Sequence, residues 1–151
     1  MAIPKNIRGY LEENHVTYWR KARPRAVTSQ EIAQLEHIPG RQFAKTVVLK
    51  ADDRFVMAVL AADRAVCLDR LEAAMGCSRL RLASEGEFAR LFPGCETGAM
   101  PPFGKLFGLP MVVDRDLSLQ GEIEFNAGVH TEVFRMSFSE FELLERPMIL
   151  D

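Results

Sequence analysis

The sequence predicts an α+β fold in which the strands form a mixed sheet. Two features carry this prediction: neighbouring β-rich segments are joined by short turns, which pairs them as hairpins, and helical segments stand among them without regular alternation. A doubly wound α/β protein would instead alternate strands and helices. The chain has 151 residues, of which 48% are hydrophobic, so we expect one domain over residues 1–151 with a sizeable core.

The strands are predicted from short runs rich in β-branched and apolar residues. Two adjacent runs, 44–50 and 55–61, are the clearest, because the turn-like segment 51–54 joins them as a hairpin. A second pair is expected on either side of residues 127–130. The predicted strands are 16–19, 44–50, 55–61, 80–82, 111–113, 122–126 and 131–136.

The helices are predicted from apolar periodicity and from capping signals. Ile3, Ile7 and Leu11 recur every four residues and give one apolar stripe. At the start of three predicted helices a Ser or Thr precedes a Glu by three residues, which is the spacing of a capping box. These boxes are Thr28–Glu31, Ser84–Glu87 and Ser137–Glu140. The predicted helices are 4–14, a segment from Thr28 that ends at Pro39-Gly40, 68–75 before Gly76, 84–91 and 137–145.

Composition argues against a secreted or membrane protein. No apolar stretch follows the charges of the N-terminus, so no signal peptide is expected. The longest apolar run, 55–62, is far shorter than a membrane span. We therefore expect a cytoplasmic protein without a membrane segment.

The cysteines and histidines do not form a recognisable metal or disulfide pattern. Cys67, Cys77 and Cys95 contain no CxxC pair, so reduced thiols are expected. The three histidines are His15, His37 and His130, and no two have helical ligand spacing. The sequence also lacks the common nucleotide-binding, zinc-protease and serine-hydrolase motifs. No metal and no cofactor are expected.

Charge is distributed unevenly along the chain. The net charge is −2, yet residues 1–50 carry nine Lys or Arg against four Asp or Glu. The basic run consists of Arg20, Lys21, Arg23 and Arg25. Such a run either forms part of a nucleic-acid-binding face or is a solvated loop, and charge alone favours the loop.

Three segments contain candidate site residues, each with a structural alternative. Lys45 opens an apolar strand, where it could hold a phosphate or carbonyl, or simply extend to water. His130 follows Gly128, which allows a sharp backbone turn near a ligand, or it is an ordinary strand-start histidine. The stiff loop 98–104 could present backbone amides to an oxyanion, or be a structural loop. Cys95 is a weak candidate nucleophile, because no base is identifiable beside it.

The order of these segments resembles the YbaK/prolyl-tRNA-synthetase-associated editing domains. The lysine strand 43–49, the GxxxP loop from Gly98 to Pro102 and the GxH of Gly128 to His130 carry the resemblance, and 28–33 is similar to the helix before the lysine strand. The similarity extends over residues 14–145. It implies a sheet curled like a barrel, with helices packed around it.

The resemblance further implies hydrolysis of the ester between an amino acid and the 3′ adenosine of a mischarged tRNA, in trans, because no synthetase is attached. Water would attack with help from the substrate's ribose hydroxyl, without a protein nucleophile or a metal. Catalytic roles are implied for Lys45, Gly98 and Pro102. Substrate-binding roles are implied for Thr46, Ala99, Met100, Pro101, Phe103, Gly104, Gly128 and His130. The partners would be the tRNA acceptor end and, in some family members, a synthetase.

Two points remain open at the level of the sequence. Pro101 is an extra proline before Pro102, which changes the expected mouth of the loop. The amino acid on the ester is not readable, since one methylene in a pocket is worth only about 1–3 kcal/mol. A non-catalytic module that binds aminoacyl-adenosine-like ligands or an RNA end would carry the same residues.

Overall fold

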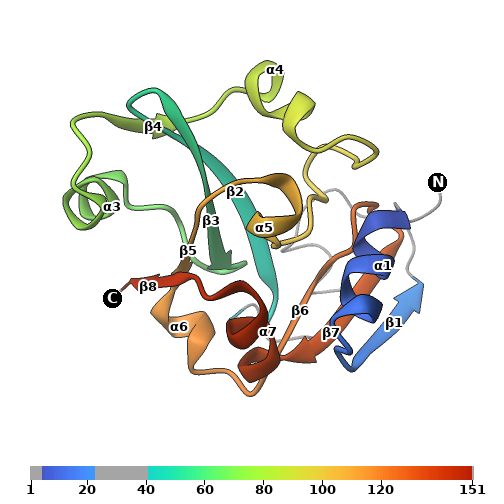
Figure 1. Cartoon of the computed structure of the whole chain (residues 1–151). Helices are drawn as coiled ribbons and strands as arrows, with labels where there is room; N and C mark the ends of the chain where they lie inside the picture. The colour runs from blue at the N-terminus through green and yellow to red at the C-terminus, as the bar shows by residue number, and fades with distance from the viewer. Residues whose placement is uncertain (1–4, 23–40, 151) are drawn as a thin grey trace.

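The computed structural model describes residues 5–22 and 41–150 and confirms an α+β fold with two sheets (Figure 1). The capping box Thr28–Glu31, the helix expected after it and the basic residues Arg23 and Arg25 lie outside the described residues. Within the described ranges, no helix is long and apolar enough to span a membrane.

The larger sheet is mixed, as the sequence predicts. Strand β2 pairs antiparallel with β3 and with β4, whereas β5 lies parallel to both β3 and β8. Its strands, in spatial order, are β4 (Leu80–Leu82), β2 (Ala44–Ala51), β3 (Arg54–Ala61), β5 (Met111–Asp114) and β8 (Met148–Leu150). The hairpin β2–β3 confirms the clearest strand prediction, whereas β8 was not predicted.

The smaller sheet is antiparallel and has three strands. They are, in spatial order, β1 (Tyr18–Ala22), β7 (Glu132–Ser137) and β6 (Glu122–Asn126). The pair β6–β7 confirms the hairpin that the sequence predicts around residues 127–130. Strand β1 begins two residues later than predicted and continues to Ala22.

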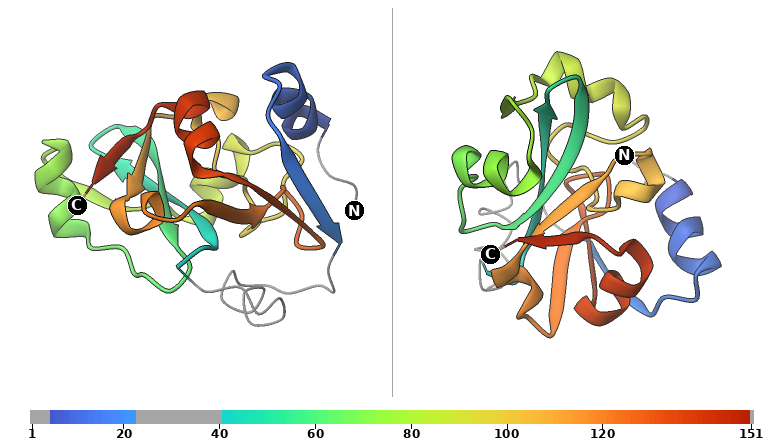
Figure 2. Two further views of the ribbon diagram at one scale, coloured as in Figure 1. Left: turned by 90° about the horizontal axis from the view of Figure 1, so that it is seen from below. Right: turned by 60° about the vertical axis from the view of Figure 1, so that its left-hand side comes forward.

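The helices are short and lie around the two sheets. They are α1 (Lys5–Glu13), α3 (Leu68–Met75), α4 (Glu85–Phe88) with the 3-10 turn Ala89–Leu91, α5 (Gly104–Phe107), α6 (Arg115–Ser118) and α7 (Phe138–Glu145). Ser84 forms the predicted capping box with Glu87, and Ser137 caps α7 by accepting from the amide of Glu140. Figure 2 shows α1 and α3 at opposite ends of the molecule.

The two sheets are not closed into a barrel, so the expected barrel-like curl is not confirmed. In the described residues they are joined by one parallel bridge, between Phe43 and Glu124. The amide of Glu124 donates there to the carbonyl of Gln42 at 3.1 Å. Beyond this bridge the two strands pair with different neighbours: β2 pairs with β3 and β4, and β6 pairs with β7.

Side chains alternate between the two faces of the larger sheet, which gives two apolar clusters. One cluster contains Val48 and Val59 and continues into the smaller sheet, where Phe103 packs edge-on against Phe125 and Phe141. The other contains Leu49, Ala58 and Leu60 and is covered by α3. The larger cluster therefore holds the two sheets together, and the smaller one seats α3.

A buried carboxyl group fastens three helices to one another. Glu145, at the end of α7, is only 5% exposed. It accepts a hydrogen bond from the Tyr10 hydroxyl of α1 at 2.5 Å and one from the Lys105 amide of α5 at 3.2 Å. Burial raises the pKa of Glu145, because the charged form is poorly solvated there.

Glu145→Gln should remove a pH dependence of stability. Because the pKa of Glu145 in the folded state lies above its ordinary value of 4.5, the folded protein holds the proton more tightly than the unfolded chain. The free energy of unfolding should therefore fall as the pH rises from about 4.5 through the raised pKa, and this fall should be absent in Glu145→Gln. Urea denaturation at a series of pH values measures it. Glu142→Gln, an exposed change in the same helix, should behave as wild type.

Candidate functional site

The structure brings two of the three predicted segments into direct contact. The loop that contains Gly98 and the turn that contains Gly128 come from different parts of the chain and are joined by backbone hydrogen bonds. The amide of Gly128 donates to the carbonyl of Ala99 at 2.9 Å, and the amide of Glu96 donates to the carbonyl of Gly128 at 2.8 Å. Both glycines have positive φ, 86° at Gly98 and 93° at Gly128, a region that other residues enter at a cost.

Glu96 and His130 complete this contact with their side chains. A carboxylate oxygen of Glu96 accepts from the amide of His130 at 2.7 Å, and Nε2 of His130 lies 2.9 Å from the carbonyl oxygen of Thr97. His130 is 5% exposed. Glu96 was not predicted as a site residue. The sequence shows it only as an acidic residue inside a loop rich in Pro and Gly. We call the contact between residues 96–99 and 128–130 the loop clamp.

Lys45 lies near the start of β2, close to the join between the sheets. It is half-buried and lies directly opposite Leu60 of β3. Burial lowers the pKa of Lys45, whereas the negative charge of Asp63 raises it by a smaller amount. Lys45 and Asn126 each stand two residues beyond the Phe43–Glu124 bridge, and Asn126 leads directly into the turn of the loop clamp. The bridge thus links the strand of Lys45 to the strand that leads into the loop clamp.

Unpaired polar atoms concentrate in this region. Among the described residues, buried atoms without a hydrogen-bond partner include Oγ1 of Thr46, Oδ1 of Asn126 and Nδ1 of His130. Folded proteins pair most buried polar atoms, so an unpaired one calls for an explanation such as a ligand. Thr46 and His130 were predicted as site residues; Asn126 was not, because an Asn at a strand end has no distinctive signal.

Most side chains of the loop after Gly98 face the core. Met100 and Phe103 belong to the larger apolar cluster, and Ala99, Pro101, Pro102 and Gly104 are also buried. Gly98 itself is exposed, and its amide lies 3.2 Å from the sulfur of Met100. The loop is therefore held by its side chains, and what it can offer a ligand is backbone.

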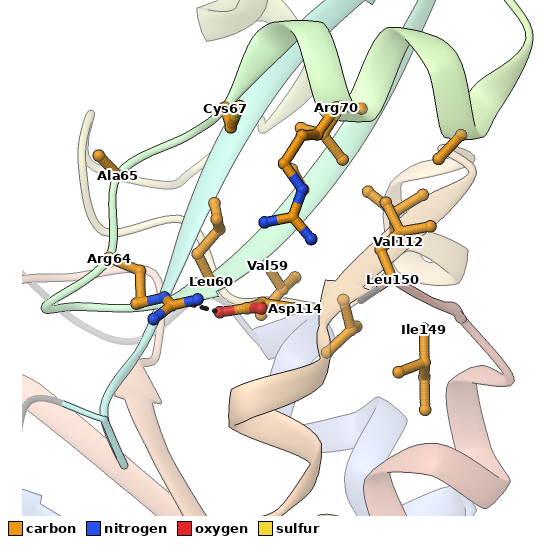
Figure 3. Close-up of a pocket in the computed structure, with 14 residues that line it drawn as sticks. Val59, Leu60, Arg64, Ala65, Cys67, Arg70, Val112, Asp114, Ile149 and Leu150 are labelled. Carbon is orange, nitrogen blue, oxygen red and sulfur yellow. Dashed lines mark ion pairs between the residues drawn. The ribbon is translucent and has the colours of Figure 1, made fainter.

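Neither of the two described cavities is lined by the predicted site residues. The first, of about 330 Å³, lies between α3 and strands β3, β5 and β8 (Figure 3). Burial raises the pKa of the Cys95 thiol to about 11, so it is protonated at neutral pH and unsuited to act as a nucleophile. Within residues 5–22 and 41–150, no three His, Cys, Asp or Glu side chains are grouped to hold a metal ion.

Residues 23–143 match the model of the aminoacyl-tRNA editing domain, which covers the lysine strand, the loop and the turn. The chain belongs to this family. It is 31% identical over 142 residues to the multifunctional Ser/Thr-tRNA deacylase ProXp-y of Escherichia coli K12, covering 84% of this chain and 82% of that protein. The alignment thus covers more than four fifths of this chain and of the deacylase.

Other relatives are larger proteins or are related by fold. The chain is 32% identical over 108 residues to a proline–tRNA ligase of Xanthomonas oryzae, covering 72% of this chain but only 19% of the ligase. A crystal structure of a candidate trans-editing enzyme for prolyl-tRNA synthetase superposes with a TM-score of 0.82 at 24% identity, covering 97% of this chain and 94% of that one. This second likeness shows the shared fold.

Glu96→Ala should loosen the loop clamp. It leaves the amide of His130 without its acceptor, which costs about 1–3 kcal/mol for a buried donor. Glu96→Gln retains an acceptor oxygen and should lose less. Chemical denaturation measures both, with the exposed Glu13→Ala as a control of equal charge change. Equal stability of Glu96→Ala and wild type would contradict the clamp.

Gly104→Ala should destabilise the end of the loop, whereas Gly86→Ala should not. A Cβ at Gly104 would lie 2.4 Å from the backbone oxygen of Leu109, so the chain must shift. Gly86, in α4, has open space and should gain roughly 0.5–1 kcal/mol on becoming Ala. Thermal and urea denaturation compare the two variants, and the prediction fails if both change stability in the same direction.

Proposed function

We propose that this chain, acting as one domain over residues 1–151, is a trans-acting aminoacyl-tRNA deacylase that hydrolyses the ester of a mischarged tRNA in the cytoplasm. The observation that carries the proposal is the loop clamp, which joins two of the three predicted segments, together with the Phe43–Glu124 bridge, which links the strand of Lys45 to the strand that leads into the clamp. Family membership and the deacylase named among the relatives support it.

In the proposed mechanism the protein positions the ester and stabilises charge, and water is the nucleophile. Lys45 holds the tRNA end or the ester, since a lysine is a compact cation suited to phosphate or to a polarised carbonyl. Backbone groups of the loop from Gly98 to Pro102 hold the aminoacyl carbonyl, where negative charge develops during attack. The ribose hydroxyl of the substrate assists the water, and no metal takes part.

The remaining residues of the region are proposed to shape the substrate pocket. Thr46 and His130 each present a buried polar atom that a ligand can pair. Gly128 allows the close backbone approach, and the side chains of the loop keep its backbone in place. The acceptor end of tRNA is the proposed partner, and a prolyl-tRNA synthetase is a second partner to test, because ligases of this kind contain a similar segment.

Lys45→Ala should lower kcat for deacylation roughly 100-fold, which is typical when one charge-stabilising donor is removed. Lys45→Arg, which keeps the charge but not its compact shape, should retain part of the activity. A panel of tRNAs mischarged with different amino acids, assayed by loss of the ester, measures this. Lys50→Ala provides the matched control, because Lys50 lies on the same strand and contacts the ring of Phe55.

Two outcomes would argue against this function. If wild type cleaves no ester of the panel yet binds tRNA tightly and in a salt-dependent way, the chain is a binding module. If Lys45→Ala is as active as wild type, the catalytic role of Lys45 is wrong.

A further inference from the structure

The cavity beside α3 combines an apolar floor with charged groups at its rim. Its floor is made of small and branched side chains from the larger sheet and from α3, namely Ala58, Leu60, Val112, Leu150, Leu71 and Ala74. Arg64, Arg70 and Asp114 also line it. Figure 3 shows the guanidinium of Arg70 reaching from α3 into the cavity toward the strands. A volume of about 330 Å³ lies within the usual range of small-ligand pockets.

This cavity lies on the same side of the larger sheet as Lys45. Directly opposite residues of an antiparallel pair present their side chains to the same face, with Cβ atoms about 5 Å apart. Lys45 is opposite Leu60, and Leu60 lines the cavity. The cavity and Lys45 therefore share one face of the larger sheet. By contrast, Met100 and Phe103 of the loop pack into the apolar cluster on the other face.

Asp114 supplies a specific polar group. Its side chain is 13% exposed, and its Oδ2 lies 3.7 Å from Nε of Arg64 without a hydrogen-bond partner among the described residues. Arg64 also pairs with Asp116 at 2.9 Å, which holds it at the rim. A carboxylate acceptor at the edge of an apolar slot matches the exocyclic amino group of cytosine, which is the donor that Asp and Glu read in nucleic acids. Uracil presents an oxygen at that position.

We propose that this cavity holds the cytidine nucleotide that precedes the terminal adenosine of the tRNA 3′ end. The base would lie on the apolar floor with its amino group on Asp114, and the neighbouring phosphate would lie near Arg70. The aminoacyl group would lie on the loop's side of the sheet. The inference rests on the proposed function, since it needs the terminal nucleotide to be held at Lys45.

The test compares binding of three short probes: adenosine 5′-monophosphate, the dinucleotide CA and the dinucleotide UA. Wild type should bind CA about tenfold more tightly than UA, which is within the discrimination of one base-edge contact. Asp114→Asn should remove this preference, and it retains a residue that caps α6 well. Arg70→Ala should weaken CA and UA alike, whereas Arg79→Ala, an exposed arginine outside the cavity, should weaken neither.

Filling the cavity with a larger side chain provides a second, independent test of the proposal. Ala74→Phe places a ring in the cavity, and Ala73→Phe places the same ring on the same helix outside its lining. Ala74→Phe should weaken CA about tenfold and leave adenosine 5′-monophosphate unchanged, and Ala73→Phe should change neither. In wild type, CA should also slow alkylation of Cys67, which lines the cavity, and not that of Cys77.

The proposal is overturned if CA and UA bind equally, if Ala74→Phe leaves CA binding intact, or if it weakens the mononucleotide as much as CA. Failure of the proposed function looks different. Wild type would then hydrolyse no mischarged tRNA while still binding CA in a manner that depends on Asp114 and Ala74.

Discussion

The candidate site depends on the loop clamp, the backbone pairing between residues 96–99 and 128–130. It joins segments about thirty residues apart, so neither can take its shape alone. Each side needs a glycine with positive φ, Gly98 and Gly128, and Glu96 closes the contact on the amide of His130. The buried side chains of the loop then fix its backbone against the core, and Glu145 ties the following helix to α1 and α7.

Strand β2 links the two sheets, and its register sets the face on which Lys45 lies. At its start, β2 meets β6 through the Phe43–Glu124 bridge, and further along it pairs with β4. Lys45 faces the side covered by α3, whereas Met100 and Phe103, which follow the loop clamp, pack into the cluster on the other side. The candidate site residues are therefore divided between the two faces of the larger sheet.

The sequence predicted what local rules determine. The hairpin β2–β3 follows from two β-rich runs and a turn, and Ser84 and Ser137 cap their helices as their spacing predicts. Motif order also indicated that Gly98 and Gly128 belong together, which the loop clamp confirms, whereas the place of Lys45 beside them stays a prediction. Glu96, Asn126 and the cavity beside α3 were not predictable, because each is defined by partners distant in sequence. The expected barrel-like curl is not confirmed for the same reason: whether two sheets close depends on edge pairing between remote strands.

The side chains around the loop clamp include a thiol, an imidazole and several unpaired polar atoms, and their arrangement limits the chemistry of the region. The thiol of Cys95 is protonated at neutral pH, and Nε2 of His130 is engaged with the carbonyl of Thr97, so neither is arranged as a nucleophile and base pair. The unpaired atoms of Thr46, Asn126 and His130 each cost the free protein about 1–3 kcal/mol relative to a paired atom. A ligand that pairs them recovers this free energy, whereas one of the same shape without matching polar groups does not. The region therefore favours ligands whose polar groups match these three atoms.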